Sequence, residues 1–494
     1  MPYIGLGRAI RLKMQSQPQS QPMSKPGKRT VSLALALILL IAGVAAGAGV
    51  TYVGLLTGGQ INGGLCSSGR TLTIGLLTDK TDGLSAQGVR AADAAVIAID
   101  DINSYLAHGQ GSASSSVTPC NLKFAVSVSD YQLDASKAQT DLQTFAAAGV
   151  QVVVGPLNSG AIIGSLLSYA NSNHIVVISP SSTSVALATP NDFLFRTAPN
   201  DRWQGMADAT MLHAEGANAV VILQRHDTYG DALANATSAD FNALVGGTVS
   251  WPANTCTSTV GPVCTIQYDT NVEDFTTIIG YVNTAFNAAN NTAANTNKVA
   301  IDAISFEEFT QLAYQVNQQH PKLITGHLPG TGSGPTPSQW TGTDGESQDT
   351  VISSNSTFDV STMRLPSTIY GFPNTTRTQA LDATFSSRYS GDVCDNYCRG
   401  TYDDMWVAAL ATLSAGSYDG TKIQAVLLAV ADNYFGVTGS NGLEASGDRV
   451  ASIYQIYKVV KVSGTNTWVF AGTWTAPPSG TTGLGTIESD FNPY

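Results

Sequence analysis

The stretch VQVVVGPLNSGAIIGSLLSYANSNHIVVISPSSTSVAL, residues 150–187, decides the fold class of this chain. It opens with the apolar, β-branched run at 150–154, which is typical of a strand buried on both faces. A Gly-Pro pair ends this strand, and residues 161–170 carry apolar side chains at helical spacing. A second buried strand follows at 175–178. The pattern therefore predicts two parallel strands joined by a helix, as in an open α/β sheet.

Both predicted strands end in loops rich in hydroxyl and amide side chains. Asn158 and Ser159 follow the first strand, and Ser181, Ser182 and Thr183 follow the second. In an open α/β sheet, ligands bind outside the carboxyl ends of the strands, where the N–H groups of a helix start favour a carboxylate or phosphate. These five residues are therefore candidates for a small-molecule site. The alternative is that they serve only as helix caps and turn residues, which Ser, Thr and Asn commonly are.

The chain is long enough for two or three domains, and its N-terminal part differs from the rest. Residues 1–30 contain six basic and no acidic residues, and residues 31–56 carry no charge and could cross a bilayer. The positive-inside rule then predicts a cytoplasmic basic tail at 1–30, a transmembrane anchor at 31–56, and a linker at 57–70 that starts an extracellular remainder. The alternative is a signal peptide cleaved within 31–56, which would give a secreted chain.

All six cysteines lie in the predicted extracellular part, and an even number in an exported chain indicates disulfides. Four of them form two local pairs in turn-rich loops. The other two each precede a predicted strand, and neighbouring parallel strands would bring them together. The predicted disulfides are Cys256–Cys264, Cys394–Cys398 and Cys66–Cys120. A metal site is the weaker alternative because the sequence has no CxxC motif.

Acidic residues outnumber basic ones by 36 to 24, and six of the basic residues lie in the tail. The remainder is strongly acidic, which argues against a nucleic-acid partner, since that needs a basic face. Sequons at Asn235, Asn290, Asn355 and Asn374 would be glycosylated surface loops if the cell modifies exported proteins. The sequence lacks the motifs of serine hydrolases, zinc proteases, P-loops and EF-hands. We therefore expect no enzyme, no cofactor and no metal.

Strand and helix patterns alternate along most of the exported part. Strands are predicted at 71–77, 122–128, 219–223 and 300–304, each followed by a helical pattern. The Cys256–Cys264 stretch is expected to be a loop. Two series of βα units joined by crossing segments predict two lobes, each a mostly parallel sheet flanked by helices, with a cleft between them. The expected segments are lobe 1 at 71–198 and 369–448, lobe 2 at 199–368, and C-terminal strands at 449–494 that return to lobe 2.

This order of motifs resembles the type I periplasmic binding fold, and within it the branched-chain amino-acid binding proteins of ABC transporters. Residues 74–103, IGLLTDKTDGLSAQGVRAADAAVIAIDDIN, are similar to the opening strand, loop and helix of that family. VVVGPLNSG and ISPSSTSVAL are similar to its two ligand loops. HDTYG at 226–230 and WTGTDG at 340–345 resemble loops of its second lobe. Together these motifs lie between about residues 71 and 474, most of the exported part.

The resemblance implies roles for residues of both lobes. The two hydroxyl-rich loops would hold a ligand's carboxylate and ammonium, and Tyr229 would close over the ligand from the second lobe. Asp344 would be the acidic residue that binds the ammonium, which is sensible because a carboxylate in a closed cleft selects for a cation. The alternative for Asp344 is an ordinary Thr-Asp-Gly turn. Phe306 stands where the family often has an aromatic hydroxyl, and it implies a more apolar wall.

The resemblance also implies a function. We expect the extracellular solute-binding component of an ABC importer, which binds a branched-chain amino acid or similar small polar solute and delivers it to permease subunits. Two alternatives remain open: a ligand-sensing receptor ectodomain built on the same fold, and a binder of amides, urea or short peptides.

Overall fold

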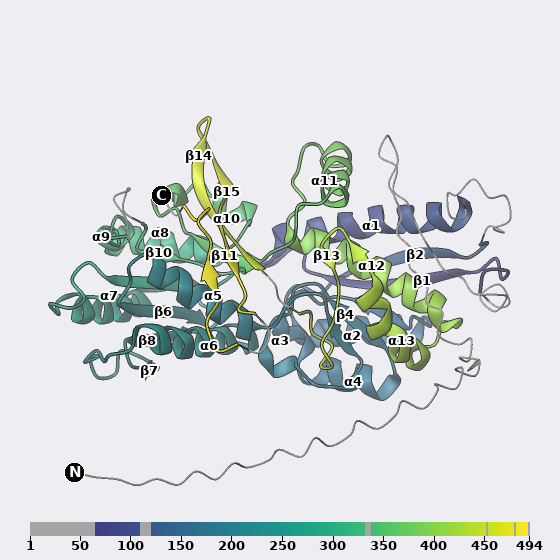
Figure 1. The fold of residues 1–494 in the computed structure, drawn as a ribbon, viewed down its shortest axis with the longest axis horizontal. Coiled ribbons are helices and arrows are strands. Elements are labelled where there is room, and N and C mark those ends of the chain that lie inside the picture. Colours follow the sequence, from purple (N-terminus) through teal and green to yellow (C-terminus); the bar gives the residue numbers. More distant parts are fainter. Residues whose placement is uncertain (1–64, 109–119, 331–336, 451–452, 479–480, 493–494) are drawn as a thin grey trace, which may run out of the picture. The chain divides into compact units, whose positions relative to one another are not determined.

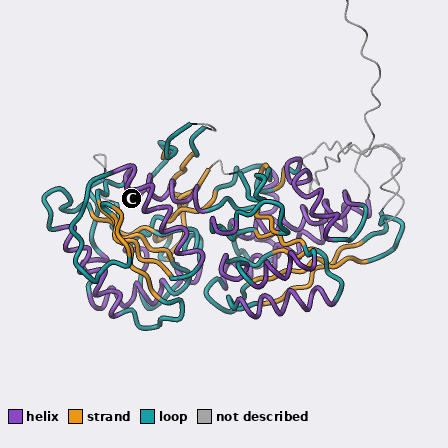
Figure 2. The backbone as a smooth tube through the Cα atoms, turned by 90° about the horizontal axis from the view of Figure 1, so that it is seen from below, coloured by secondary structure: helices purple, strands orange, loops and turns teal. Residues whose placement is uncertain are grey.

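The computed structural model describes residues 65–108, 120–330, 337–450, 453–478 and 481–492 (Figure 1). The described chain contains two five-stranded sheets that are wholly or mostly parallel, and Figure 2 shows helices lining the strands. We call the part around the first sheet lobe 1 and the part around the second lobe 2. This is the two-lobed α/β architecture predicted from the sequence.

The sheet of lobe 1 is entirely parallel and has the order β2-β1-β3-β4-β5. Its strands are β1 (Thr71–Thr78), β2 (Lys123–Asp130), β3 (Val152–Val154), β4 (Val176–Ser179) and β5 (Leu194–Arg196). Every residue of β3 and β4 is buried, because helices cover both faces of the sheet. One face packs against α1 (Ser85–His108), α12 (Asn396–Ala415) and α13 (Gly420–Asn433). The other packs against α2 (Ala135–Ala147), α3 (Ser159–Ile162) and α4 (Ser165–Asn173), followed by the 3₁₀ turn η3 (Val185–Leu187).

The sheet of lobe 2 has the order β10-β9-β6-β8-β7, and only β7 runs antiparallel to its neighbour. Its strands are β6 (Ala219–Arg225), β7 (Ser258–Val260), β8 (Val263–Tyr268), β9 (Val299–Ile304) and β10 (Trp340–Thr341). Its helical elements are α5 (Asp201–Ala214), α6 (Thr228–Val245), α7 (Thr276–Asn290), α8 (Phe309–Gln319), α9 (Pro321–Ile324), α10 (Thr350–Ser354) and η4 (Val360–Thr362).

The stretch expected as a Cys256–Cys264 loop differs from the prediction. It contains β7 and leads directly into β8, which pairs with β6 along six residues. The turn between them holds Gly261 in the left-handed region, at φ +56°, and the neighbouring Gly and Pro made the sequence look irregular. Burial of Val263, Ile266 and Tyr268 explains why this segment is a strand.

A third sheet is antiparallel and has the order β11-β14-β15-β16. Its strands are β11 (Ser367–Tyr370), β14 (Ile453–Val462), β15 (Thr465–Thr475) and β16 (Thr486–Ile487). The strands β14 and β15, which Figure 1 shows in yellow, form an antiparallel hairpin within the stretch where C-terminal strands were predicted. Its partner β11 comes from far earlier in the chain, and the sequence did not reveal that pairing. The remaining elements are α11 (Thr376–Arg388), β12 (Phe435–Gly436) and β13 (Gly439–Ser440).

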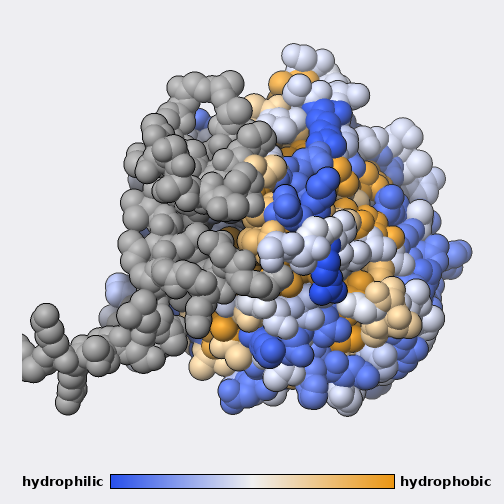
Figure 3. Space-filling view, turned by 90° about the vertical axis from the view of Figure 1, so that its right-hand side faces the viewer, coloured by the Kyte–Doolittle hydropathy of each residue, from blue (hydrophilic) through white to orange (hydrophobic). Residues whose placement is uncertain are grey.

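All three predicted disulfides are present: Cys66–Cys120, Cys256–Cys264 and Cys394–Cys398. The first joins the chain just before β1 to the chain just before β2, the neighbouring strand, as expected from their parallel pairing. On the face that Figure 3 shows, hydrophilic residues are interleaved with apolar ones, as on the surface of a globular protein.

The predicted localisation as a single-pass membrane protein is contradicted. In the part of the chain that the structure describes, no helix is both long and apolar enough to cross a membrane. The proposed anchor at 31–56 and the tail before it lie outside the described residues, as does most of the linker. Of the sequons, Asn235 lies within α6 and its Thr237 is buried, whereas Asn374 is exposed just before α11. Glycosylation at the four sites stays a prediction.

Candidate functional site

The two hydroxyl-rich loops of lobe 1 are tied together at the carboxyl ends of β3 and β4. Gly155 begins the first loop at φ +82°, and a Cβ there would lie 2.0 Å from the carbonyl oxygen of Leu77, so only glycine fits. The Ser181 hydroxyl donates to the Leu157 carbonyl at 2.7 Å, and the Ser182 hydroxyl donates to the Pro156 carbonyl at 3.2 Å. These two hydroxyls therefore bind the loops to each other.

The other polar side chains of these loops keep capacity for a ligand. The Ser159 hydroxyl oxygen accepts from the N–H groups of Thr183 and Ser184 at 3.2 and 3.1 Å, which leaves its O–H available to donate. The Thr183 hydroxyl is buried beside the Asp201 carboxyl and, unlike the hydroxyls of Ser181 and Ser182, makes no hydrogen bond to a backbone carbonyl of the described residues. Asn158 accepts from the Tyr131 hydroxyl at 2.8 Å through its carbonyl oxygen, so its amide N–H₂ remains a donor.

Lobe 2 contributes the start of α6 and the loop after β10. The Tyr229 hydroxyl donates to Asp344 Oδ1 at 2.7 Å and lies 2.9 Å from the Thr343 hydroxyl. Gly345 brings this loop close to the end of β9, since a Cβ on it would lie 2.1 Å from the Ser305 carbonyl oxygen. Tyr229 and Asp344, which the sequence predicted to act together, are therefore in direct contact.

Phe306 stacks on Tyr229 with ring centroids 5.4 Å apart and an angle of 16° between the ring planes. The Arg225 guanidinium also stacks on the Phe306 ring, with its central carbon 3.6 Å from the ring centroid. Arg225 in turn pairs with Asp227 at 2.7 Å and with Glu308 at 2.8 Å. Because both Tyr229 and Arg225 stack on its ring, Phe306 supports the Tyr229 ring.

The environment of Asp344 favours its neutral form when no cation is near. Burial raises the pKa of Asp344 from 3.8 to about 6, and hydrogen bonds from Tyr229 and Gln204 partly oppose this shift. The side chain is 2 % exposed. A ligand ammonium would restore the charge partner that this carboxylate lacks within the protein.

Asp201 is a second acid at this place, and the sequence analysis missed it. It is the first residue of α5, its N–H donates to the Thr183 carbonyl at 2.8 Å, and its buried carboxylate lies beside the Thr183 hydroxyl. Burial and the nearby charge of Asp344 raise the pKa of Asp201 well above its ordinary value. An acid in the first turn of a helix is common, because the helix dipole favours it, so its sequence context gave no signal.

The assembled site has opposite chemistry on its two walls. Lobe 1 offers hydroxyl and amide donors from Ser159, Thr183 and Asn158, and lobe 2 offers the carboxyls of Asp201 and Asp344. Neither carboxyl forms an ion pair within the described chain, and the described residues contain no cluster of His, Cys, Asp and Glu that could hold a metal ion. The arrangement suits a small molecule that carries a carboxylate at one end and an ammonium at the other.

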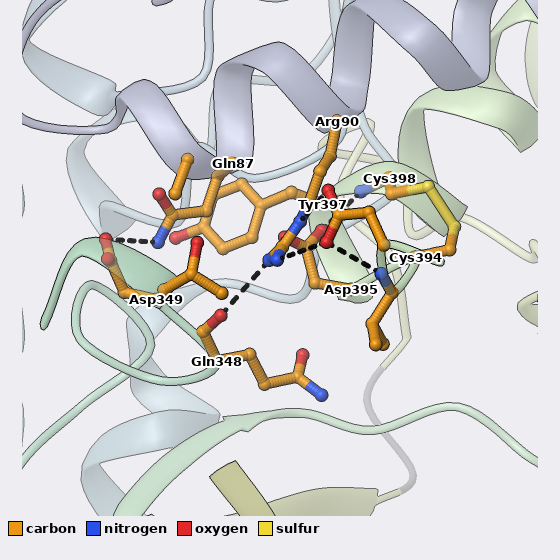
Figure 4. Close-up of polar contacts among 12 residues, drawn as sticks. Gln87, Arg90, Gln348, Asp349, Cys394, Asp395, Tyr397 and Cys398 are labelled. Carbon is orange, nitrogen blue, oxygen red and sulfur yellow. Dashed lines mark hydrogen bonds and ion pairs between the residues drawn. A yellow bond between two sulfur atoms is a disulfide. The ribbon is translucent and has the colours of Figure 1, made fainter. Parts of the chain in front are cut away.

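The two lobes are in contact around this site. Leu84, Ala91 and Leu157 of lobe 1 belong to the same apolar cluster as Tyr229 and Phe306 of lobe 2. At the start of α1, the Ser85 hydroxyl donates to Glu307 at 2.8 Å. Figure 4 shows a second set of polar contacts, in which Gln87 and Arg90 of α1 reach Asp349 and Gln348. In this structure, lobe 1 and lobe 2 are therefore in direct contact beside the site.

Comparisons with known proteins agree with this architecture. A family model described as the receptor family ligand binding region matches residues 90–256. A leucine-binding protein from Thermotoga maritima has a TM-score of 0.62 at 18% identity, covering 81% of this chain and 98% of that one. A branched-chain amino-acid transporter substrate-binding protein from Streptococcus pneumoniae, in complex with isoleucine, has a TM-score of 0.60 at 17% identity, covering 81% and 100%.

Two further matches are a binding protein with a different kind of ligand and a relative of undescribed function. A solute-binding protein of an ABC transporter from Rhodopseudomonas palustris, in complex with 3,4-dihydroxybenzoic acid, has a TM-score of 0.60 at 14% identity, covering 82% of this chain and 98% of that one. An uncharacterized protein of Methanocaldococcus jannaschii is 26% identical over 83% of this chain and 90% of its own length. The structural likenesses confirm the type I periplasmic binding fold, and at these identities they show the fold alone.

Proposed function

We propose that this chain is a solute-binding protein that takes up an amino acid, or a similar small zwitterion, between its lobes and supplies it to the permease of an ABC importer. The observation that carries this proposal is the pair of buried carboxyls, Asp201 and Asp344, neither of which forms an ion pair with a described residue, together with the Ser159 O–H, which is available to donate. Binding requires no chemical step, and we assign no catalytic residue.

The size of the expected effect makes the proposal easy to test. A ligand at about 100 times its dissociation constant stabilises a protein by about 2.7 kcal/mol, which a thermal-shift screen detects. The screen covers the twenty amino acids, with amides, urea, dipeptides and 3,4-dihydroxybenzoate beside them. A shift with leucine, isoleucine or valine that disappears in Asp344→Asn supports the proposal. Shifts confined to amides, urea or the aromatic acid would contradict the zwitterion reading.

The permease is proposed as partner because several of the solved structures that share this fold are described as solute- or substrate-binding proteins of ABC transporters. A second candidate function is a ligand-sensing receptor domain, and the match to a receptor ligand-binding family model favours it. Reconstitution separates the two. An importer component stimulates ATP-dependent uptake of its solute by permease-containing vesicles, whereas a receptor domain binds the solute without stimulating uptake.

A further inference from the structure

The segment that follows Asp344 is fastened to lobe 1 as well as to lobe 2. Within lobe 2, Glu346 binds Ser305 and Thr343. Four hydrogen bonds join the segment to α1 and α12 of lobe 1. They are Tyr397 Oη to Asp344 O at 3.3 Å, Arg90 Nη1 to Gln348 O at 3.2 Å, Asn396 N to Gln348 Oε1 at 3.2 Å, and Gln87 Nε2 to Asp349 Oδ2 at 3.0 Å. We call these four contacts the interlobe latch.

Arg90 occupies the centre of the latch (Figure 4). Its guanidinium donates to Asp392 at 2.8 and 3.2 Å, to Asp395 at 3.0 Å and to the Gln348 carbonyl at 3.2 Å. The side chain is only 4% exposed. One planar group therefore joins α1, the start of α12 and the segment after Asp344. A lysine ammonium cannot reproduce this geometry, because it lacks the rigid fork of donors.

The start of α12 is built to hold the acid that faces Arg90. Asp395 caps the helix by accepting from Cys398 N–H at 2.8 Å through one oxygen and from Arg90 through the other. The Cys394–Cys398 disulfide closes the same turn. Although burial favours the neutral form, the carboxylates of Asp395 and Asp392 raise the pKa of Arg90 above its ordinary value. The arginine is therefore a fixed, charged donor for the Gln348 carbonyl.

We propose that Arg90 is a positioning residue for ligand binding: by holding the Gln348 backbone against lobe 1, it keeps the Asp344 loop over the bound solute. The inference rests on the proposed function, since it concerns the same site. The bonds of Arg90 to Asp392 and Asp395 lie within lobe 1 and survive when the lobes part, whereas the bond to Gln348 is lost. Arg90 therefore acts mainly on how long a solute stays bound.

The first test compares Arg90→Lys with Arg399→Lys. Arg399 also lies near the start of α12 and pairs through two nitrogens with Asp382. It donates as well to the Asn396 side chain at 3.0 Å, whereas only the backbone N–H of Asn396 takes part in the latch. Stopped-flow and calorimetric titration with L-leucine, L-isoleucine and L-valine should show affinity about tenfold weaker in Arg90→Lys, through faster dissociation, since a hydrogen bond from a charged donor is lost. Arg399→Lys should bind like the wild type. Equal dissociation rates in all three proteins would overturn the proposal.

A second measurement needs no solute. Hydrogen–deuterium exchange across residues 343–349 should be faster in Arg90→Lys than in the wild type, and Gln87→Met, which removes only the bond to Asp349, should act in the same direction. A merely structural role would instead lower the melting temperature of the whole protein and leave the exchange pattern of this segment unchanged. Unchanged exchange in both variants overturns the latch. Failure of the wild type to bind any of the three amino acids overturns the proposed function, while the exchange result still decides the latch.

Discussion

The two walls of the site differ in how far the protein itself satisfies their polar groups. In lobe 1, the hydroxyls of Ser181 and Ser182 donate to neighbouring backbone carbonyls. The Ser159 oxygen accepts from two N–H groups, and its O–H stays available to donate. In lobe 2, Asp201 and Asp344 are buried without any cation. Most polar groups of the first wall therefore have protein partners before a ligand arrives, whereas burial disfavours the charged form of both carboxyls of the second wall. If the ligand is the zwitterion proposed above, its positive charge supplies most of the discrimination.

The largest expected effect comes from removing a lobe 2 carboxylate. Asp344→Asn and Asp201→Asn should each weaken amino-acid binding by about 1.5–3 kcal/mol, because each removes a charge-assisted hydrogen bond to the ammonium. Asp302→Asn is the matched control, since Asp302 is a fully buried acid of lobe 2 that accepts from Thr341 instead of facing the site. If calorimetry shows that Asp302→Asn weakens amino-acid binding as much as the other two substitutions do, Asp201 and Asp344 have no special role in recognising the ammonium.

As the pH is lowered, the affinity for the solute should fall while the stability of the apo protein rises. The ammonium binds ionised Asp344, whose pKa without ligand is about 6, so affinity should fall about tenfold for each pH unit below that value. The same raised pKa stabilises the folded apo protein fully below the ordinary value of 3.8, and this contribution is lost as pH rises through about 6. Buried Asp302, with its pKa raised to about 7, adds to the loss.

Calorimetry at about pH 5 and about pH 8 measures the change in affinity, and melting curves of the apo protein at the same two pH values measure the change in stability. The apo protein should melt at a higher temperature at the lower pH while binding its solute more weakly there. An affinity that does not change between the two values would mean that Asp344 is not the ammonium partner.

A smaller effect is expected in lobe 1, where two hydroxyls of one loop have different partners. Thr183→Val removes a hydroxyl that lies beside the Asp201 carboxyl and bonds to no backbone carbonyl of the described chain, so it should weaken binding by about 1 kcal/mol and change the apo melting temperature little. Ser182→Ala removes the bond to Pro156, so it should lower the melting temperature with little effect on affinity. The reverse outcome would assign Thr183 a purely structural role.

The smallest effect is expected from the disulfides. Replacing Cys394 and Cys398 by Ser loosens the turn that presents Asp395, and it should cost up to about 1 kcal/mol of binding free energy, comparable to weakening a helix cap. The same replacement at Cys256 and Cys264, beside β7 and β8, should lower stability without changing affinity. Equal affinities for both double variants would show that the Cys394–Cys398 disulfide does not contribute to ligand binding.

The sequence revealed the elements whose signal is local. The buried runs of β3, β4, β6 and β9 are apolar and β-branched because helices cover both faces of their sheets, and the loops after them carry the predicted side chains. Tyr229 and Asp344 were found through loop motifs that resemble known binding proteins, and the structure places them 2.7 Å apart. The roles predicted for these residues in ligand binding stay predictions.

What the sequence could not show depends on contacts between distant segments. Asp201 looks like an ordinary acid at a helix start, and only its position beside Thr183 and near Asp344 distinguishes it. Phe306 was expected to form an apolar wall, but Arg225 and Tyr229 stack against its ring, and no local pattern encodes that stack. Likewise, Arg90 is buried because α12 and the Gln348 segment cover it, and both lie far from it in the sequence.

Calorimetric titration with three related probes tests most directly whether the two walls bind opposite ends of a zwitterion. L-leucine carries both ends, 4-methylpentanoate lacks only the ammonium and isopentylamine lacks only the carboxylate. The opposed walls predict that leucine binds and that each half-molecule binds at least about a hundredfold more weakly, since each loses one set of charge-assisted bonds. 4-Methylpentanoate binding as tightly as leucine would show that the lobe 2 carboxyls do not recognise an ammonium, and it would contradict the central claim.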